Sequence, residues 1–220
     1  MRATRQLELP IRSWGGRRAG AGRKPNPGRR SVAHRRRPMH DPRCPVHVTL
    51  RARRDLPSLR GDRIFPTLRA ALAAASRKAF RVLHYSVQHD HVHLLVEADA
   101  SSSLRPGIQG LAIRVAKAVN RAIHRRGRVW SDRHHARMLA TPRDVRNALI
   151  YVLQNWRKHH RNVRGLDPRS SAAWFAGWRT TPPGVAETPP VAEPRTWLAR
   201  IGWRRGGLVG VDEAPRGGPR

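Results

Sequence analysis

The spacing of apolar residues changes several times between residues 43 and 160, and the order of these changes limits the chain to few folds. Alternating, β-branched segments, typical of half-buried strands, are separated by segments with the apolar spacing of amphipathic helices. The predicted strands span residues 45–51, 80–88, 91–97 and 129–139, and the predicted helices span residues 63–79, 108–125 and 141–160. The order β-α-β-β-α-β, followed by a last helix, predicts an α+β fold of the ferredoxin-like type. This fold has a four-stranded antiparallel sheet with two helices on one face.

Two helix boundaries carry specific signals. Gly127 follows the second predicted helix and is expected to end it, since glycine readily adopts the left-handed conformation of a C-cap. The last predicted helix begins with Thr141 as N-cap, Pro142 at the first position and Asp144 at the third. This combination is typical of a helix start.

Composition divides the chain into three parts. Residues 1–42 are rich in Arg, Gly and Pro, and they have too few large apolar side chains to offset the entropy of ordering. They are therefore predicted to form a flexible basic arm. Residues 43–160 form the predicted folded domain. Residues 161–220 return to Pro and Gly and are predicted to pack on this domain in short pieces, through the isolated residues Trp174, Trp178, Trp197 and Trp203.

The charge of the chain indicates a polyanionic partner. It has 45 Lys and Arg residues against 14 Asp and Glu residues, a formal net charge of +31. Such an excess repels itself in an isolated compact protein but favours binding to nucleic acid. A GC-rich coding sequence is an alternative explanation for the preference for arginine, but it does not explain the scarcity of acids.

Cysteine content and hydropathy predict a soluble intracellular protein. Cys44 is the single cysteine, which excludes an internal disulfide framework and a multi-cysteine zinc site. The longest apolar run, residues 70–75, is far too short to span a membrane, and no apolar signal segment is recognised at the N-terminus. We expect a cytoplasmic, nucleoid-associated protein with no membrane partner.

A His-x-His pair on the third predicted strand is the strongest local signal. Residues two apart on a strand point to the same face, so His91 and His93 project together and offer two neutral imidazoles to a metal ion. The alternative is a pair of hydrogen-bonded histidines without a metal. A third ligand is expected from the last helix, where the carboxamide of Gln154 or Asn155 would suit a hard divalent ion.

Tyr151 on the same helix is a candidate nucleophile. It lies one turn before Asn155 and therefore shares a helix face with it. A tyrosine beside a metal site can attack a phosphodiester that the metal polarises. The alternative is an ordinary residue of an amphipathic helix. The other tyrosine, Tyr85, is predicted to lie in the core because of its parity on the second strand.

Taken together, the ordered motifs resemble the HUH single-tyrosine transposases, and most closely their REP-associated members and insertion-sequence relatives. The resemblance covers about residues 43–160 and rests on Val46–Thr49, Ser86–Glu97, Val129–Arg137 and Tyr151–Asn155. Insertion-sequence members often place glutamine where this chain has Asn155, whereas REP-associated members tend to have asparagine.

The resemblance implies a DNA transposase that cleaves and rejoins single-stranded, hairpin-bearing DNA through a 5′-phosphotyrosine. It implies that Tyr151 is the nucleophile and that His91 and His93 are ligands of Mg²⁺ or Mn²⁺. Of Gln154 and Asn155, the helical spacing favours Asn155 as the third ligand. No ATP is required, because transesterification conserves the bond energy. The protein would act as a monomer or a homodimer.

Several other residues have two interpretations. His47 on the first strand either lies in the core, which is the favoured interpretation, or faces DNA. The basic residues near the fourth strand either bind phosphate or form a solvated edge; these are Arg133, His134, His135 and Arg137. Asp90 either orients a neighbouring imidazole or belongs to a turn with His89.

The basic arm contains residues predicted to contact DNA: Arg17, Arg18, Arg23 and Lys24. The segment is similar to a minor-groove AT-hook, although Lys24 interrupts that motif, and a nonspecific basic tether is an equal alternative.

A second hypothesis is a non-catalytic or domesticated DNA- or RNA-binding protein on the same fold. RNA-recognition sheets stack bases on exposed aromatic residues. The predicted strands here contain few aromatics, chiefly Tyr85 and Trp130, which disfavours that kind of module.

Overall fold

The computed structural model describes residues 39–159, 165–180 and 187–214. The chain divides into two units, Met1–Ser31 and Val32–Arg220. The first unit, and with it nearly all of the predicted basic arm, lies outside the described residues. None of the described helices of the second unit is both long and apolar enough to cross a membrane.

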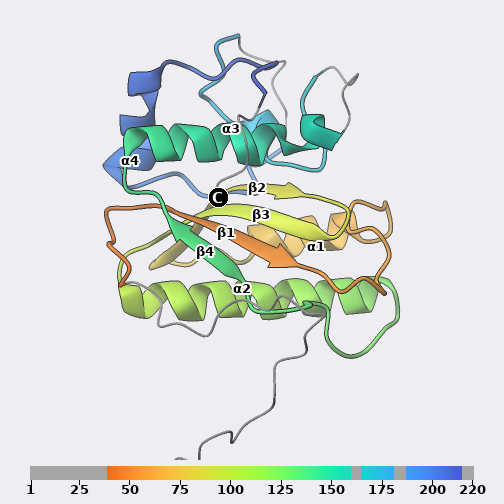
Figure 1. Cartoon of the computed structure of the whole chain (residues 1–220). Coiled ribbons are helices and arrows are strands. Elements are labelled where there is room, and N and C mark those ends of the chain that lie inside the picture. The colour runs from red at the N-terminus through yellow and green to blue at the C-terminus, as the bar shows by residue number, and fades with distance from the viewer. Residues whose placement is uncertain (1–38, 160–164, 181–186, 215–220) are drawn as a thin grey trace, which may run out of the picture. The chain divides into compact units, whose positions relative to one another are not determined.

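A four-stranded antiparallel sheet forms the centre of this unit (Figure 1). Its strands are β1 (Val46–Arg51), β2 (Phe80–Val87), β3 (His91–Ala98) and β4 (His135–Met138), in the order β2-β3-β1-β4. This order and the intervening helices confirm the predicted α+β, ferredoxin-like fold. Only β4 is much shorter than predicted, because the residues before it pair only through an isolated bridge between Trp130 and Ala52, the residue after β1.

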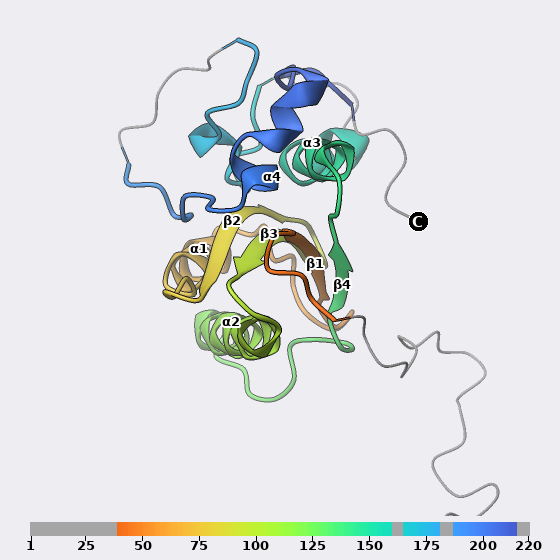
Figure 2. The same ribbon diagram turned by 90° about the vertical axis from the view of Figure 1, so that its left-hand side faces the viewer.

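The two faces of the sheet carry different layers, as Figures 1 and 2 show from two sides. Helices α1 (Phe65–Ala73) and α2 (Ser101–Ala122) cover one face, and α3 (Pro142–His159) covers the other. Strand alternation explains this division: Val46, Val48 and Leu50 of β1 enter the core under α1 and α2. The residues between them therefore face α3.

Short pieces of the C-terminal segment pack around α3. They are the 3-10 helices η1 (Ala172–Trp174) and η2 (Gly202–Gly206) and the short helix α4 (Trp197–Arg200). Trp178 and Trp203 are buried in one cluster with Leu149 and Leu153 of α3. Of the other two tryptophans expected to make such contacts, Trp174 is only half-buried and Trp197 has 49% of its surface exposed.

Two helix boundaries differ from the prediction. Helix α2 begins at Ser101 instead of residue 108, and Pro106 lies inside its early turns. A proline there costs one hydrogen bond, which the long apolar face of the helix outweighs. The helix ends at Ala122 and not before Gly127; His124, with φ 51°, adopts the left-handed conformation instead. Histidine is one of the few residue types, besides glycine, that is enriched in this conformation.

Helix α1 is also shorter than predicted, because the chain after Ala73 turns before entering β2. The start of α3 is confirmed. The Asp144 N–H donates to the Thr141 hydroxyl (3.1 Å), and this hydroxyl donates to the Asp144 carboxylate (2.7 Å). These bonds fix the first turn of the helix that carries Tyr151.

Candidate active site

Histidines from two neighbouring strands gather on the sheet face under α3. His91 and His93 point to this face as predicted, with ring centroids 4.6 Å apart. His47 joins them from β1, because the β1–β3 register pairs His47 with Leu95 and Thr49 with His93. The His47 and His93 rings are stacked at 5.3 Å.

Hydrogen bonds orient both imidazoles of the His-x-His pair. The His93 Nδ1 atom lies 3.1 Å from the Thr49 hydroxyl and 3.3 Å from His47 Nε2. The His91 Nδ1 atom lies 2.7 Å from the Asp90 carboxylate. In each ring the atom in these contacts is Nδ1, and a metal ion would be bound through Nε2.

Tyr151 places its ring against this histidine cluster. Its centroid lies 4.9 Å from that of His93 and 5.6 Å from that of His47, in edge-to-face geometry. The side chain is half-buried, and this burial raises the pKa of the phenol. Tyr85, in contrast, is buried in the core on the opposite face, where burial raises its pKa as well. The structure thus brings Tyr151, and not Tyr85, to the histidines.

The two adjacent carboxamides of α3 have different environments. Gln154 Nε2 donates to the backbone carbonyls of Gly210 (3.2 Å) and Val211 (2.5 Å), and Gln154 Oε1 accepts from Arg157 Nε (3.0 Å). Asn155 is buried, with 1% exposed, and neither its Oδ1 nor its Nδ2 atom has a hydrogen-bond partner among the described residues. Gln154 therefore holds the C-terminal segment, while Asn155 retains its full capacity to bind a ligand.

The sequence favours a core position for His47 and predicts no functional role for Thr49. His47 is indeed buried, with 3% exposed, but it belongs to the histidine cluster. Burial, together with the charges of His135 and Arg137, lowers its pKa to about 4, so that its ring is neutral at pH 7. Alternation in residues 46–51 marks the face of His47 and Thr49, but their contact with His93 depends on the pairing of strands distant in sequence.

The described residues include no group of three or more His, Cys, Asp or Glu side chains that could hold a metal ion. A divalent ion at the His91–His93 pair would therefore need a ligand of another type. The buried Asn155 carboxamide, one helical turn beyond Tyr151 and with both polar atoms unsatisfied, fits that requirement.

Comparison with known proteins identifies the family. Residues 42–153, about half of the 220-residue chain, match the model of a family described as "Transposase IS200 like". The chain belongs to the IS200-like transposases. The predicted family is confirmed, and the protein is a DNA-binding, DNA-processing enzyme of transposition. The family match ends two residues before Asn155.

A structural neighbour of this IS200-like transposase is a REP-associated tyrosine transposase, solved bound to a REP hairpin. The two chains are 18% identical, with a TM-score of 0.48, over 59% of this chain and 75% of the other. A search among curated proteins gives no match.

Only some of the predicted DNA-binding residues of this transposase lie beside the candidate active site. Arg137 pairs with His47 across β1 and β4 and forms an ion pair with Asp144 at 3.1 Å. Arg133 is exposed and His134 half-buried in the segment before β4. The remaining predicted contacts lie outside the described residues; these are Arg17, Arg18, Arg23 and Lys24.

Proposed function

We propose that this transposase cleaves and rejoins single-stranded, hairpin-bearing DNA through a covalent 5′-phosphotyrosine at Tyr151, with a divalent metal ion as cofactor. The observation that carries the proposal is the position of the Tyr151 ring, 4.9 Å from His93, on the helix that also carries the unsatisfied Asn155. A tyrosine, two imidazoles and a carboxamide form the set needed for metal-assisted attack on a phosphodiester.

His91, His93 and Asn155 would hold Mg²⁺ or Mn²⁺. The metal, when bound, supplies polarisation of the scissile phosphate and neutralises charge that develops on it. Asp90 and Thr49 hold the two imidazoles through Nδ1, and the Nε2 atoms would bind the ion. His47, neutral at pH 7, adds no positive charge that would repel the ion.

Tyr151 performs the covalent step. Its phenolic oxygen forms a bond to phosphorus while the bond from phosphorus to the 3′ oxygen breaks. The phenolic proton leaves, and the departing 3′ oxygen takes up a proton, so charge balances. Because one phosphodiester replaces another, the free 3′-OH can later reverse the step without an external energy source. The phenol is protonated at neutral pH, and burial raises its pKa further, so the nucleophile keeps its proton until substrate is in place.

The test is the formation of a covalent adduct. The full-length protein is incubated with hairpin-bearing single-stranded DNA and Mg²⁺ or Mn²⁺, and the products are separated under denaturing conditions. DNA labelled at its 3′ end should move with the protein, whereas a 5′-end label should appear in a shorter free fragment. This distribution distinguishes a 5′-phosphotyrosine from a 3′ linkage.

Two matched variants assign the nucleophile. Tyr151→Phe should form no adduct, yet should bind the hairpin within about threefold of wild type, because one hydroxyl contributes roughly 1 kcal/mol or less to the interface. Tyr85→Phe should retain the adduct, since Tyr85 lies in the opposite core. An adduct formed by Tyr151→Phe would disprove the assignment. A wild type that binds hairpins tightly but forms no adduct would support the non-catalytic alternative.

A further inference from the structure

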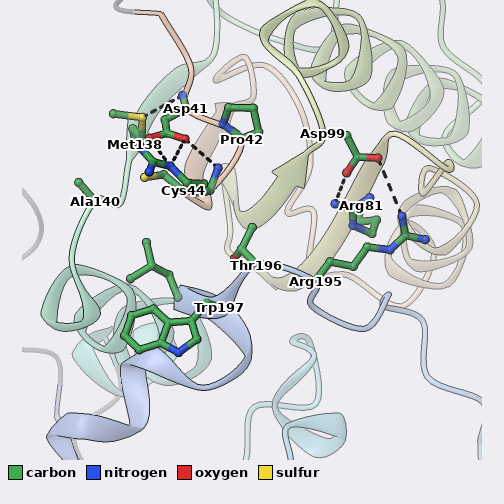
Figure 3. Close-up of a pocket in the computed structure, with 12 residues that line it drawn as sticks. Asp41, Pro42, Cys44, Arg81, Asp99, Met138, Ala140, Arg195, Thr196 and Trp197 are labelled. Atoms are coloured by element: carbon green, nitrogen blue, oxygen red, sulfur yellow. Dashed lines mark hydrogen bonds and ion pairs between the residues drawn. The ribbon is translucent and has the colours of Figure 1, made fainter.

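A cavity of about 720 Å³ lies at the end of the sheet where β1 begins, away from His91 at the other end. Figure 3 shows residues that line it: Asp41–Cys44 before β1 with Met138, the last residue of β4, beside Asp41, then Ala140 just after β4, and Arg195–Trp197 of the C-terminal segment. The volume lies within the range of about 300–1,000 Å³ typical of small-ligand pockets. The proposed cleavage chemistry makes no use of this cavity.

An exposed aromatic ring is the main apolar surface of the cavity. Trp197 has 49% of its surface exposed, and Met138, on another wall, has 38% exposed. The indole rests on Gly202, where an added Cβ would lie 2.7 Å from the ring, and the Arg205 guanidinium lies 5.0 Å from the indole centroid. The ring is thus held in place by a tight glycine contact, and a cation lies over it.

Charged groups that both donate and accept hydrogen bonds form the rim. Asp41 pairs with Arg43 at 2.8 Å, and Asp99 pairs with the buried Arg81 at 2.6 Å and with Arg195 at 3.9 Å. The Arg43 and Arg195 side chains remain 88% and 60% exposed. Base edges are recognised by such carboxylates and guanidinium groups, and phosphates are bound by exposed arginines.

The cavity lies close to the candidate active site along the same strands. Cys44 on the cavity wall is buried on the α3 side of the sheet, three residues before His47 of the histidine cluster. At about 3.3 Å per residue this separation is roughly 10 Å. A DNA strand crossing the site therefore reaches the cavity within a few nucleotides.

We propose that this cavity receives one unpaired nucleobase of the DNA strand, in contact with the Trp197 indole and with its sugar-phosphate next to Arg43, Arg195 and Arg205. Single-stranded nucleic acid is commonly held by aromatic rings that contact bases and basic side chains that contact phosphates. The proposal rests on the proposed function for its substrate, single-stranded DNA flanking a hairpin.

An abasic scan tests the proposal by binding alone. A hairpin with single-stranded extensions is made as a series in which each unpaired base in turn is removed, and affinity for the full-length protein is measured without divalent metal. One position should lower the affinity of the wild type roughly tenfold, the range of one base–aromatic contact. In Trp197→Ala the intact DNA should bind roughly tenfold more weakly, and the same abasic position should have no further effect.

Two further variants separate the cavity from the rest of this surface. Ile201→Ala, with 53% exposed just after α4 and outside the cavity lining, should keep the wild-type abasic profile. Ala140→Trp should fill the cavity from the opposite wall and reproduce the Trp197→Ala profile with the indole still present. A flat wild-type profile, or an unchanged position-specific loss in Trp197→Ala, would overturn the proposal. So would a Trp197→Ala effect confined to self-association, which would make the surface a contact between two copies. If the adduct assay succeeds while the abasic profile is flat, the cavity assignment fails and the proposed cleavage stands.

Discussion

Gln154 and Asn155 show how two similar neighbouring side chains on one helix can differ in what they do. The Gln154 side chain donates hydrogen bonds to the backbone carbonyls of Gly210 and Val211 and accepts one from Arg157. Asn155, equally buried, forms no hydrogen bond within the described residues. A buried polar group without a partner costs free energy, so Asn155 is unfavourable for stability unless it binds a ligand.

This contrast gives the first prediction. Asn155→Leu should leave the melting temperature unchanged or raise it, because an unsatisfied buried amide is replaced by an apolar group of similar size. The same variant should lose metal-dependent cleavage and should bind Mn²⁺ more weakly in calorimetry.

Gln154→Leu is the matched control. It should lower stability by about 1–3 kcal/mol, because the carbonyls of Gly210 and Val211 lose their donor. It should retain Mn²⁺ binding in the folded protein. If Asn155→Leu destabilised the protein as much as Gln154→Leu does, Asn155 would have a structural role.

At the scale of the elements, local patterns predicted which residues share a face, and distant pairings supplied the rest. Parity on β3 was sufficient to place His91 and His93 together, and helical spacing was sufficient for Tyr151 and Asn155. The inclusion of His47 depends on the register between β1 and β3, which pairs residues more than 40 positions apart and leaves no signal in either strand alone. The identity of the unsatisfied carboxamide likewise depends on where the C-terminal segment packs.

The contact between β2 and the C-terminal segment gives a prediction on pH. His84 is partly buried, with its Nδ1 atom 3.2 Å from the Ser171 hydroxyl and its ring 5.3 Å from that of Phe175. Burial lowers its pKa from 6.5 to about 4. Between these two values the unfolded chain takes up a proton and the folded protein does not, so stability is complete above pH 6.5 and falls as the pH falls toward 4.

The measurement is urea unfolding at pH 7 and pH 5 for the wild type and for His84→Gln, which keeps a polar partner for Ser171 but does not titrate. The wild type should lose about 2 kcal/mol more than the variant between these pH values. His47 is shifted in the same direction and contributes equally to both proteins. Equal losses in the two proteins would show that the His84 site accepts a proton without cost.

At the scale of the whole molecule, charge dominates. The net charge of +31 is spread over the chain, and twelve of the 45 Lys and Arg residues lie in residues 1–38. Binding to DNA releases counterions in proportion to the phosphates that a protein neutralises, so affinity should fall steeply as salt rises.

Removing the positive charges of residues 1–38 should separate the electrostatic part of DNA affinity from recognition of the hairpin. A full-length protein with the twelve basic residues of 1–38 replaced by glutamine should show a smaller slope of log affinity against log salt than wild type. Its preference for hairpin over unstructured single strands should persist, because we expect the folded domain and not residues 1–38 to recognise the hairpin. The check is a binding titration at several salt concentrations. A slope equal to that of the wild type would mean that residues 1–38 make no phosphate contacts.

The packing of the C-terminal segment on α3 has a consequence for the growing polypeptide. Helix α3, which carries Tyr151, is buried against Trp178, Leu198, Trp203 and Val209 of the C-terminal segment. Arg146, near the start of this helix, forms an ion pair with Glu213 at 2.7 Å. A nascent chain on the ribosome can therefore pair its four strands and assemble the histidines long before this helix has its final support. The candidate active site therefore gains the full support of its helix only after residues 209–213 have been made.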